Sequence, residues 1–342
     1  TLAKALINIG VYVDMFSNKK KKQNKSRTLG LSKSNIKFFE KNILNIEKLL
    51  WEISKIEIYS ENLNYEKILN FENKNERLFS VIKNYELNDF LLSELNKSKL
   101  FSVKKKIVNY DLIKDNYKLI VNCDYENQIT KKFFYKKFYK DYGGYAHTAI
   151  IEHKKILNNT ASQTFTKKGP IAFLPISNFQ TSVVYSVKDL KDIELTNLVK
   201  KYNNKYEIKK IRDICNFKLN ASDLRSYHYK NILAFGDMLH KLHPLAGQGF
   251  NMSIRDIKKL IELIKFKIDH GLDLDNSICL DFEKVSKHRN YLFSRSIDFV
   301  YEFFNLENKI KNSILSKAVK LLGKNNLINK FFIKFADKGI TI

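Results

Sequence analysis

The stretch "GDMLHKLHPLAGQGFNMSIRD", residues 236–256, gathers two residue types that this chain otherwise uses sparingly. The sequence of 342 residues has 11 glycines and 3 prolines. Four of them, Gly236, Pro244, Gly247 and Gly249, fall within 14 consecutive positions, where an even spread would put fewer than one. Because glycine and proline give the backbone conformations that other residues disfavour, the stretch predicts a loop of special geometry.

The residues on either side of this loop predict the elements that hold it. The apolar run "NILAFGD" (231–237) is typical of a buried strand, and open α/β sheets bind ligands where such strands end, here at Asp237. Apolar residues at helical spacing follow over 250–264. Unpaired N–H groups at the start of that helix, beside bare glycine backbone, favour a flat ligand that becomes anionic. The alternative is a glycine-capped turn that binds nothing.

Bulk composition limits the class of protein. The length favours two closely packed domains, and 44% hydrophobic residues argue against wholesale disorder. The three cysteines are odd in number and far apart, which predicts neither a disulfide framework nor a zinc site and indicates a reducing compartment. No signal peptide is recognisable, and no apolar run is long enough to span a bilayer.

The formal net charge of +25 has two interpretations. It is typical of proteins with an acidic partner, either nucleic acid or an anionic membrane surface. It also follows from a coding bias, since lysine, asparagine and isoleucine are abundant while glycine and proline are scarce. We expect no nucleic-acid partner, because the sequence has no zinc-finger spacing, RNA-binding aromatic motif or internal repeat.

The stretch 236–256 resembles a long and specific family signature. Its pattern GD-x-x-H-x-x-HP-x-AGQG-x-N-x-x-x-x-D is typical of ubiquinone-biosynthesis hydroxylases of the UbiH/UbiF/VisC type, within the aromatic-ring flavoprotein monooxygenase family. "QTFTKKGPIAFLPIS" (163–177) resembles a second segment of these enzymes, and "RTLGLS" (27–32) is similar to a third. The C-terminal part also follows the family's helices, so the resemblance covers essentially the whole chain.

The chain departs from the family pattern in three places. The family's first strand and GxGxxG loop, which seat the FAD pyrophosphate, are absent. "TLAKAL" (1–6) looks like the helix that follows them, so the sequence is either a fragment or a relative that has lost this loop. Ser17 stands where an acidic residue usually holds the adenosine ribose. In "NCDYENQ" (122–128), Asp124 is kept while Tyr125 and Gln128 replace a glycine and a serine.

The resemblance implies a mixed α/β fold with three parts. A doubly wound FAD-binding sheet would carry an inserted, mainly antiparallel substrate sheet and C-terminal helices. The FAD-binding domain would comprise residues 1–50, 83–141 and 226–275. The substrate sheet would comprise residues 51–82 and 142–225, and the C-terminal helical region residues 276–342. Within these parts, the residue pattern predicts a helix over 34–50 and a strand meander over 53–82.

The resemblance also implies the cofactor and its binding residues. The cofactor is FAD, and eight positions match the family's binding residues: Arg27, Asp124, Asp237, Pro244, Gly247, Gln248, Gly249 and Asn251. Asp237 would bind the ribityl hydroxyls, and the backbone of 247–249 would face the flavin pyrimidine. Arg27 would lie near the pyrophosphate, with an exposed basic residue as the alternative. No catalytic acid or base can be named. No metal site is expected, because His240 and His243 have no third ligand of suitable spacing.

Two functions follow from these matches and departures. The resemblance implies an FAD-dependent monooxygenase that hydroxylates the aromatic ring of a polyprenyl phenol or quinone precursor in ubiquinone biosynthesis. NAD(P)H would reduce the flavin, and a flavin C4a-hydroperoxide formed with O2 would transfer the hydroxyl group. The missing phosphate loop and Tyr125 motivate the alternative, a flavin-free, non-catalytic relative that serves as a subunit of a quinone-synthesis assembly.

The last third of the chain predicts where the protein acts. Apolar faces over 314–322 and 327–335 alternate with lysines, as in amphipathic helices that rest on an anionic membrane. An oily precursor in the membrane would suit such a surface. We therefore expect a cytoplasmic protein, peripheral on the inner face of the membrane and in contact with other quinone-synthesis enzymes. The alternative for these helices is core packing against the flavin domain.

Overall fold

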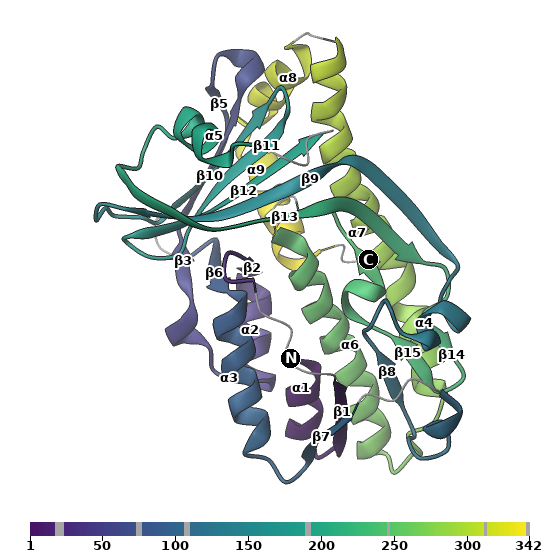
Figure 1. Ribbon diagram of the computed structural model, residues 1–342. Helices are drawn as coiled ribbons and strands as arrows, with labels where there is room; N and C mark the ends of the chain where they lie inside the picture. The colour runs from purple at the N-terminus through teal and green to yellow at the C-terminus, as the bar shows by residue number, and fades with distance from the viewer. Residues whose placement is uncertain are drawn as a thin grey trace.

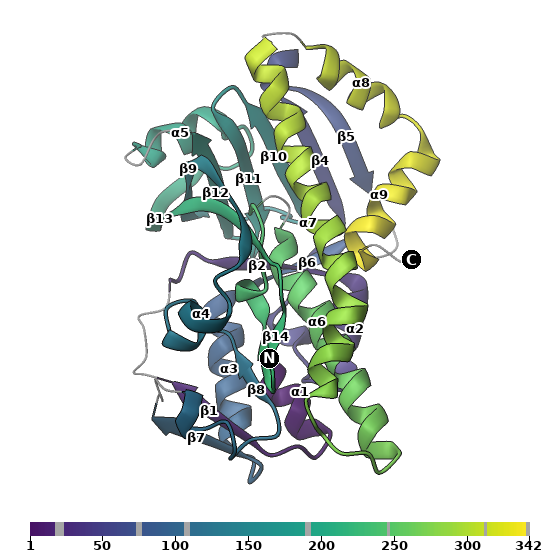
Figure 2. The same ribbon diagram turned by 90° about the vertical axis from the view of Figure 1, so that its right-hand side faces the viewer.

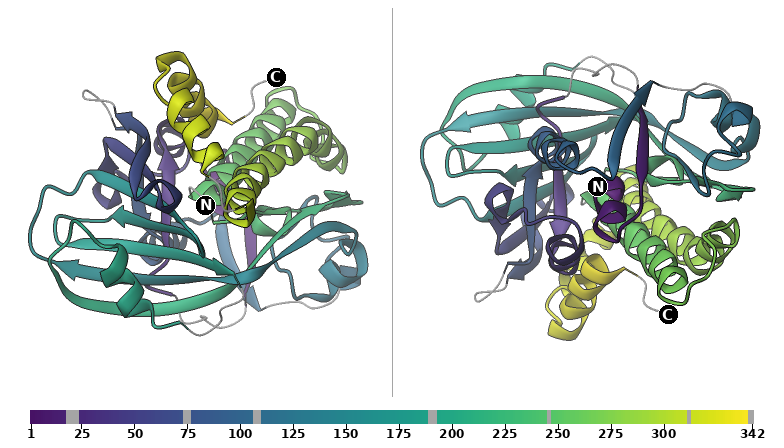
Figure 3. Two further views of the ribbon diagram at one scale, coloured as in Figure 1. Left: turned by 90° about the horizontal axis from the view of Figure 1, so that it is seen from above. Right: turned by 90° about the horizontal axis from the view of Figure 1, so that it is seen from below.

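The computed structural model describes residues 1–17, 24–72, 77–105, 110–188, 193–244, 247–310 and 313–339. A large sheet lies above a layer of helices and small sheets, and the long helix α7 (Ser277–Ile310) runs beside both (Figure 1). At its far end the chain returns through α8 (Ile314–Leu322) and α9 (Asn326–Lys338), which lie on the same side as strand β5 (Figure 2). The sheet curves along one side of the molecule and the C-terminal helices lie on the other (Figure 3).

The large sheet has eight described strands in the order β16-β13-β9-β12-β11-β10-β4-β5. Neighbours run antiparallel except β10 and β4, which are parallel. In chain order the strands are β4 (Lys55–Ser60), β5 (Glu66–Glu72), β9 (Lys137–His153), β10 (Thr160–Thr166), β11 (Gly169–Pro175), β12 (Gln180–Lys188), β13 (Ile208–Leu224) and β16 (His240–Lys241).

One face of this sheet forms its own core under helix α5 (Leu195–Tyr202). Alternate residues of the central strands, such as Val183 and Tyr185 of β12, point to the same face because side chains in a strand alternate sides. They pack against Leu195 and Val199 of α5, and all four side chains are almost fully buried. The other face packs against the lower layer and against α7.

The lower layer contains three small sheets among the described strands. The first is a parallel pair, β1 (Val13–Ser17) and β7 (Phe101–Lys105). The second has the order β14-β15-β8, and the third has the order β2-β6-β3. Their strands are β14 (His228–Tyr229), β15 (Ile232–Ala234), β8 (Ile120–Asn122), β2 (Thr28–Ser32), β6 (Phe79–Lys83) and β3 (Trp51–Ile53).

Four helices cover these small sheets and share their core. They are α1 (Leu2–Asn8), α2 (Lys33–Asn42), α3 (Asn84–Asn96) and α6 (Gln248–Asp269). The apolar stripe predicted for 250–264 is confirmed, since Ile257, Leu260 and Ile264 of α6 are buried against β15 and α2 residues in one cluster. A short helix, α4 (Gln128–Phe133), is capped at its start by Asn127, whose side chain accepts a hydrogen bond from Thr130 N.

The expected mixed α/β class is confirmed, and two local expectations differ from the structure. The helix expected over 34–50 ends at Asn42, because Ile43 leaves helical geometry and turns inward to the core; a short 3-10 turn follows at Glu47–Leu49. The meander expected over 53–82 divides between two sheets. β4 and β5 join the large sheet, whereas β6 lies between β2 and β3 in a separate small sheet. Three consecutive buried residues in β6 explain the difference, since they indicate a strand covered on both faces.

Candidate functional site

Two parallel strands bring separate loops to one edge. β15 and β8 pair in register at Ala234 and Asn122, and Phe235 N donates to Asn122 O at 2.9 Å immediately beyond the strand. The loops that follow therefore lie side by side, one carrying Asp124 and Tyr125 and the other Gly236 and Asp237. The hydroxyl of Tyr125 donates a hydrogen bond to the backbone carbonyl of Asp237. The expected position of Asp237 at a carboxyl edge of parallel strands is what the structure has.

Arg27 reaches the same place from a distant part of the sequence. Its Nη2 lies 3.7 Å from Oδ2 of Asp237, and both side chains are about half exposed. Such an exposed pair adds little to stability, so its significance is where it holds the two groups. Lys241 of β16 is a third charge nearby; burial lowers the pKa of Lys241, and the carboxylate of Asp237 partly offsets that effect. One carboxylate and two cations thus meet beside the loop.

The glycines of the loop leave bare main chain. Gly236 has φ +67°, and a Cβ added there, or at Gly249, would meet no protein atom within 4 Å. Gly247 has φ +61° and precedes α6 as its N-cap, which a residue with a Cβ would adopt only with strain. Among the residues that the structure describes, no side chain caps the first turn of α6, so its first N–H groups face the loop. The side chain of Gln248 is buried, and its Oε1 has no hydrogen-bond partner among the described residues.

Other predicted positions hold the loop in place. Asn251 is buried, and its side chain accepts from Ser32 N at 3.0 Å and donates to Gly30 O at 2.9 Å. It thereby fastens α6 to β2. Asp124 accepts from Glu126 N at 2.9 Å and shapes its own turn. Pro244 lies at the bend before the loop.

The structure adds a pair that the sequence prediction did not assign. Nε2 of His240 lies 2.5 Å from Oδ2 of Asp256, and Asn290 Nδ2 donates to Oδ1 of the same carboxylate at 2.8 Å. His240 and Asp256 are both buried. Burial alone would lower the pKa of His240, but Asp256 outweighs it and raises that pKa above its ordinary value. Both residues belong to the quoted motif, GD-x-x-H followed by D, which is the signal that could have identified them.

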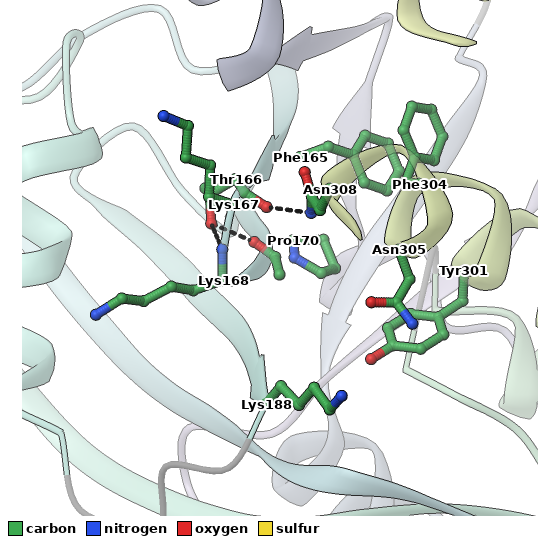
Figure 4. A pocket seen from close by; sticks show the side chains of 11 residues that line it. Phe165, Thr166, Lys167, Lys168, Pro170, Lys188, Tyr301, Phe304, Asn305 and Asn308 are labelled. Carbon is green, nitrogen blue, oxygen red and sulfur yellow. Dashed lines mark hydrogen bonds between the residues drawn. The ribbon is translucent and has the colours of Figure 1, made fainter. Parts of the chain in front are cut away.

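A cavity of about 420 Å³ lies between the β10–β11 hairpin and α7 (Figure 4). Aromatic side chains form part of its wall: Phe165 stacks on Phe304, with ring centroids 3.5 Å apart, and Tyr301 lies further along α7. Asn308 Nδ2 donates to Thr166 O at 3.1 Å and ties the hairpin to the helix. Lys167, Lys168, Gly169, Pro170, Lys188 and Asn305 complete the lining.

The loop fits the cofactor that the sequence implies. An isoalloxazine ring needs main chain that it can approach closely, and the open space at Gly236 and Gly249 supplies it. It also needs hydrogen-bond partners at its polar edge, for which the uncapped α6 N–H groups and the orphaned Oε1 of Gln248 are available. Among the described residues, no cluster of three or more His, Cys, Asp or Glu side chains could hold a metal ion.

Comparisons with known proteins point to the same cofactor. The profile of the family described as FAD binding domain matches residues 153–269. The ubiquinone biosynthesis monooxygenase COQ6 of Schizosaccharomyces pombe is 27% identical over 125 residues, 36% of this chain and 26% of that protein. The ubiquinone hydroxylase UbiL of Rhodospirillum rubrum is 26% identical over 176 residues, 47% of this chain and 41% of that protein. The chain thus spans less than half the length of these two relatives.

Solved structures share the fold. The p-nitrophenol 4-monooxygenase PnpA of Pseudomonas putida superposes with a TM-score of 0.79 at 12% identity, covering 99% of this chain and 96% of that one. HpxO of Klebsiella pneumoniae, solved with FAD and uric acid, gives a TM-score of 0.73 at 10% identity, covering 99% and 93%.

Fold and loop together define the class: residues 153–269 match the FAD binding domain family, and the whole chain has the fold of the monooxygenase PnpA. Its cofactor is FAD. Within this class the chain is related to the ubiquinone-biosynthesis hydroxylases of the UbiH/UbiF type.

Proposed function

We propose that this protein is an FAD-dependent monooxygenase that hydroxylates the aromatic ring of a polyprenyl phenol or related quinone precursor in ubiquinone biosynthesis. The observation that carries the proposal is the loop after β15, where open glycine backbone and an uncapped helix start stand beside Asp237 and Arg27. The sequence relatives, which are ubiquinone biosynthesis monooxygenases, supply the pathway.

Each part of the site has a task in this proposal. FAD, when bound, supplies the redox chemistry that takes electrons from NAD(P)H and reduces O2. The α6 N–H groups favour negative charge on the ligand they face, because the helix start carries a positive partial charge. Asp237 holds hydroxyl groups, Arg27 holds a phosphate, and Asn251 keeps α6 fixed to β2. The aromatic wall of the 420 Å³ cavity receives the apolar precursor.

The cofactor and the product give the test. The protein, purified as it is encoded, is expected to show the visible absorption of bound flavin. With a short-chain prenyl phenol it should consume NAD(P)H and yield a product heavier by one oxygen atom. A folded, colourless protein that takes up no added FAD would refute the proposal. That result would favour the flavin-free subunit, for which the Tyr125 contact with Asp237 is the supporting observation.

The C-terminal helices support a peripheral place on a membrane. Large apolar side chains of α8 and α9 are exposed, reaching 75% at Leu327, 70% at Leu321 and 64% at Phe331. Lysines accompany them at positions 317, 320, 324, 330 and 334, and Asp337 is the single acidic residue over 313–339. An apolar surface ringed by cations suits an anionic lipid surface. None of the described helices is long and apolar enough to cross a bilayer.

The expected apolar faces divide between two roles. Val319 and Phe335 pack into the core shared by α7 and β5, and Phe335 stacks on Phe293 with centroids 5.2 Å apart. Gly323 lies so close to β5 that an added Cβ would fall 2.9 Å from Ile68 O. One side of these helices therefore anchors them, and the other side is the surface that we propose for the membrane. We also propose that the chain divides into an FAD-binding domain, a substrate sheet and a C-terminal helical region, as the sequence predicts. The exception is β3 and β6, which pair in the lower layer and not in the substrate sheet.

A further inference from the structure

A buried histidine lies next to the candidate cofactor loop, and neither of its ring nitrogens is hydrogen-bonded to a described residue. His243 is 2% exposed, and its Nδ1 and Nε2 both lack a hydrogen-bond partner among the described residues. Tyr142 meets its ring edge-on at 4.9 Å between centroids, and Tyr301 lies against it at 4.3 Å. Because buried polar groups are nearly always hydrogen-bonded, a histidine without a partner calls for a ligand or a role.

The position of His243 joins the loop to the cavity. It follows β16 and directly precedes Pro244 at the start of the loop. Tyr301, whose ring packs on His243, also lines the 420 Å³ cavity. Tyr301 thus stands between the imidazole and the cavity, and rotation of its side chain is the movement that contact between His243 and a molecule in the cavity requires.

The charged groups around His243 are occupied with one another. Asp298 accepts from Tyr142 at 2.9 Å and pairs with Lys140 at 2.7 Å, while Lys140 also pairs with Glu302 at 2.8 Å. Burial is the main influence on the imidazole and lowers the pKa of His243 to about 3, with Asp298 and Glu302 opposing and Lys140 adding to this effect. The ring is therefore neutral at physiological pH and offers one nitrogen as an acceptor.

We propose that His243 accepts a hydrogen bond from the hydroxyl group of a phenol bound in the cavity. This inference rests on the proposed function and names the group that orients its substrate. A phenol that donates to a neutral imidazole gains electron density on its ring, as electrophilic hydroxylation requires. No proton is transferred, so the step needs no further reactant. The aromatic residues Phe165, Phe304 and Tyr301 suit the apolar remainder of such a molecule.

The test compares a phenol with its methyl ether, which cannot donate. The affinities of 2-geranylphenol and 2-geranylanisole for the protein are measured by equilibrium dialysis in the absence of NAD(P)H. We expect the wild type to prefer the phenol about tenfold, the value of one buried hydrogen bond. His243→Phe should lose this preference and keep its affinity for the ether. His243→Asn, whose amide oxygen accepts, should restore part of it. His270→Phe, at an exposed position, is the matched control and should behave as the wild type.

The outcomes distinguish a failure of the role proposed for His243 from a failure of the proposed function. If the wild type binds phenol and ether equally, or if His243→Phe keeps the preference, the role of His243 is refuted while the proposed function stands. If the wild type binds neither compound, both fail. If His243→Phe does not fold, the test uses the wild type and His243→Asn. The wild type must then prefer the phenol over its methyl ether, and His243→Asn, which keeps an acceptor, must keep part of this preference.

Discussion

Nε2 of His240 and Oδ2 of Asp256 lie 2.5 Å apart in a part of the molecule that water does not reach. The first residue belongs to β16 and the second to α6, so this contact closes the loop that separates them. Asn290 of α7 bonds the other oxygen of the carboxylate. The candidate cofactor loop is therefore held from below by a buried, hydrogen-bonded His–Asp pair, and above it the glycine backbone is open.

The His240–Asp256 pair predicts a pH-dependent stability. The folded pKa of His240 is raised, so its stabilising contribution is complete below the unfolded value of about 6.5 and is lost as pH rises through the folded pKa. The difference in unfolding free energy between wild type and His240→Gln should be largest below about pH 6, on the order of 3 kcal/mol, and should shrink at alkaline pH. Urea denaturation across a pH series measures it. A difference that grows with pH would mean a neutral imidazole in the fold.

Gly249→Ala should separate folding from cofactor binding. The new Cβ meets no protein atom within 4 Å, and alanine is the better helix former, so the free energy of unfolding should rise by up to about 1 kcal/mol. The same Cβ would enter the space that we assign to flavin, so the affinity for FAD should fall about tenfold. Gly271→Ala is the counterpart: φ +65° makes it cost about 1 kcal/mol, yet flavin binding should not change. Unchanged FAD affinity in Gly249→Ala would place the cofactor elsewhere.

Tyr125→Phe tests whether the tyrosine supports or obstructs the site. Its hydroxyl donates to the Asp237 carbonyl, and burial raises the pKa of Tyr125, so the donor is protonated throughout the accessible pH range. Loss of this partly exposed hydrogen bond should lower the unfolding free energy by about 0.5 kcal/mol. Tyr12→Phe, at a position that is 73% exposed, should have no effect. Flavin content should change less than twofold; a large gain in Tyr125→Gly would instead show that the tyrosine excludes the cofactor.

The surface on α8 and α9 predicts binding to anionic vesicles. Sedimentation with vesicles containing phosphatidylglycerol should retain the wild type, whereas vesicles of phosphatidylcholine alone should not. Leu327→Glu combined with Phe331→Glu should weaken retention at least tenfold, since each change removes apolar burial and adds repulsion. Phe266→Glu is the control, because Phe266 is also exposed (56%) and lies on α6, away from this surface. Equal loss in both variants would argue against a membrane surface on α8 and α9.

Local patterns in the sequence predicted much of the fold. The strand before Asp237, the turn at Gly247 and the stripe of α6 follow from glycine placement and spacing alone, because each is decided by neighbours along the chain. Long-range partners were not predictable in this way. The sequence placed Asn251 at the cofactor loop, and the structure adds a hydrogen bond from its side chain to Gly30, 221 residues away, which no local pattern encodes.

In the candidate site too, local features were predictable from the sequence and long-range contacts were not. Arg27 and Asp237 were proposed separately and lie 3.7 Å apart, because β2 begins near the place where β15 ends. The pairing of His240 with Asp256, and the packing of His243 between Tyr142 and Tyr301, depend on which side chains fill the space around them. Packing of that kind is a property of the assembled core and cannot be read from spacing.

Helix α7 runs beside both layers, and this arrangement limits how the layers can move. Its 34 residues make a rod about 50 Å long. Ile278 and Phe282 near one end are embedded in the core of the lower layer, whereas Phe293 and Phe304 belong to the core beneath the large sheet. A hinge motion between the two layers would have to bend α7 or pull one end of it out of the core in which it is buried. We therefore expect any change in the width of the cavity beside Tyr301 to come from side chains and the β10–β11 hairpin, while the two layers keep their mutual orientation.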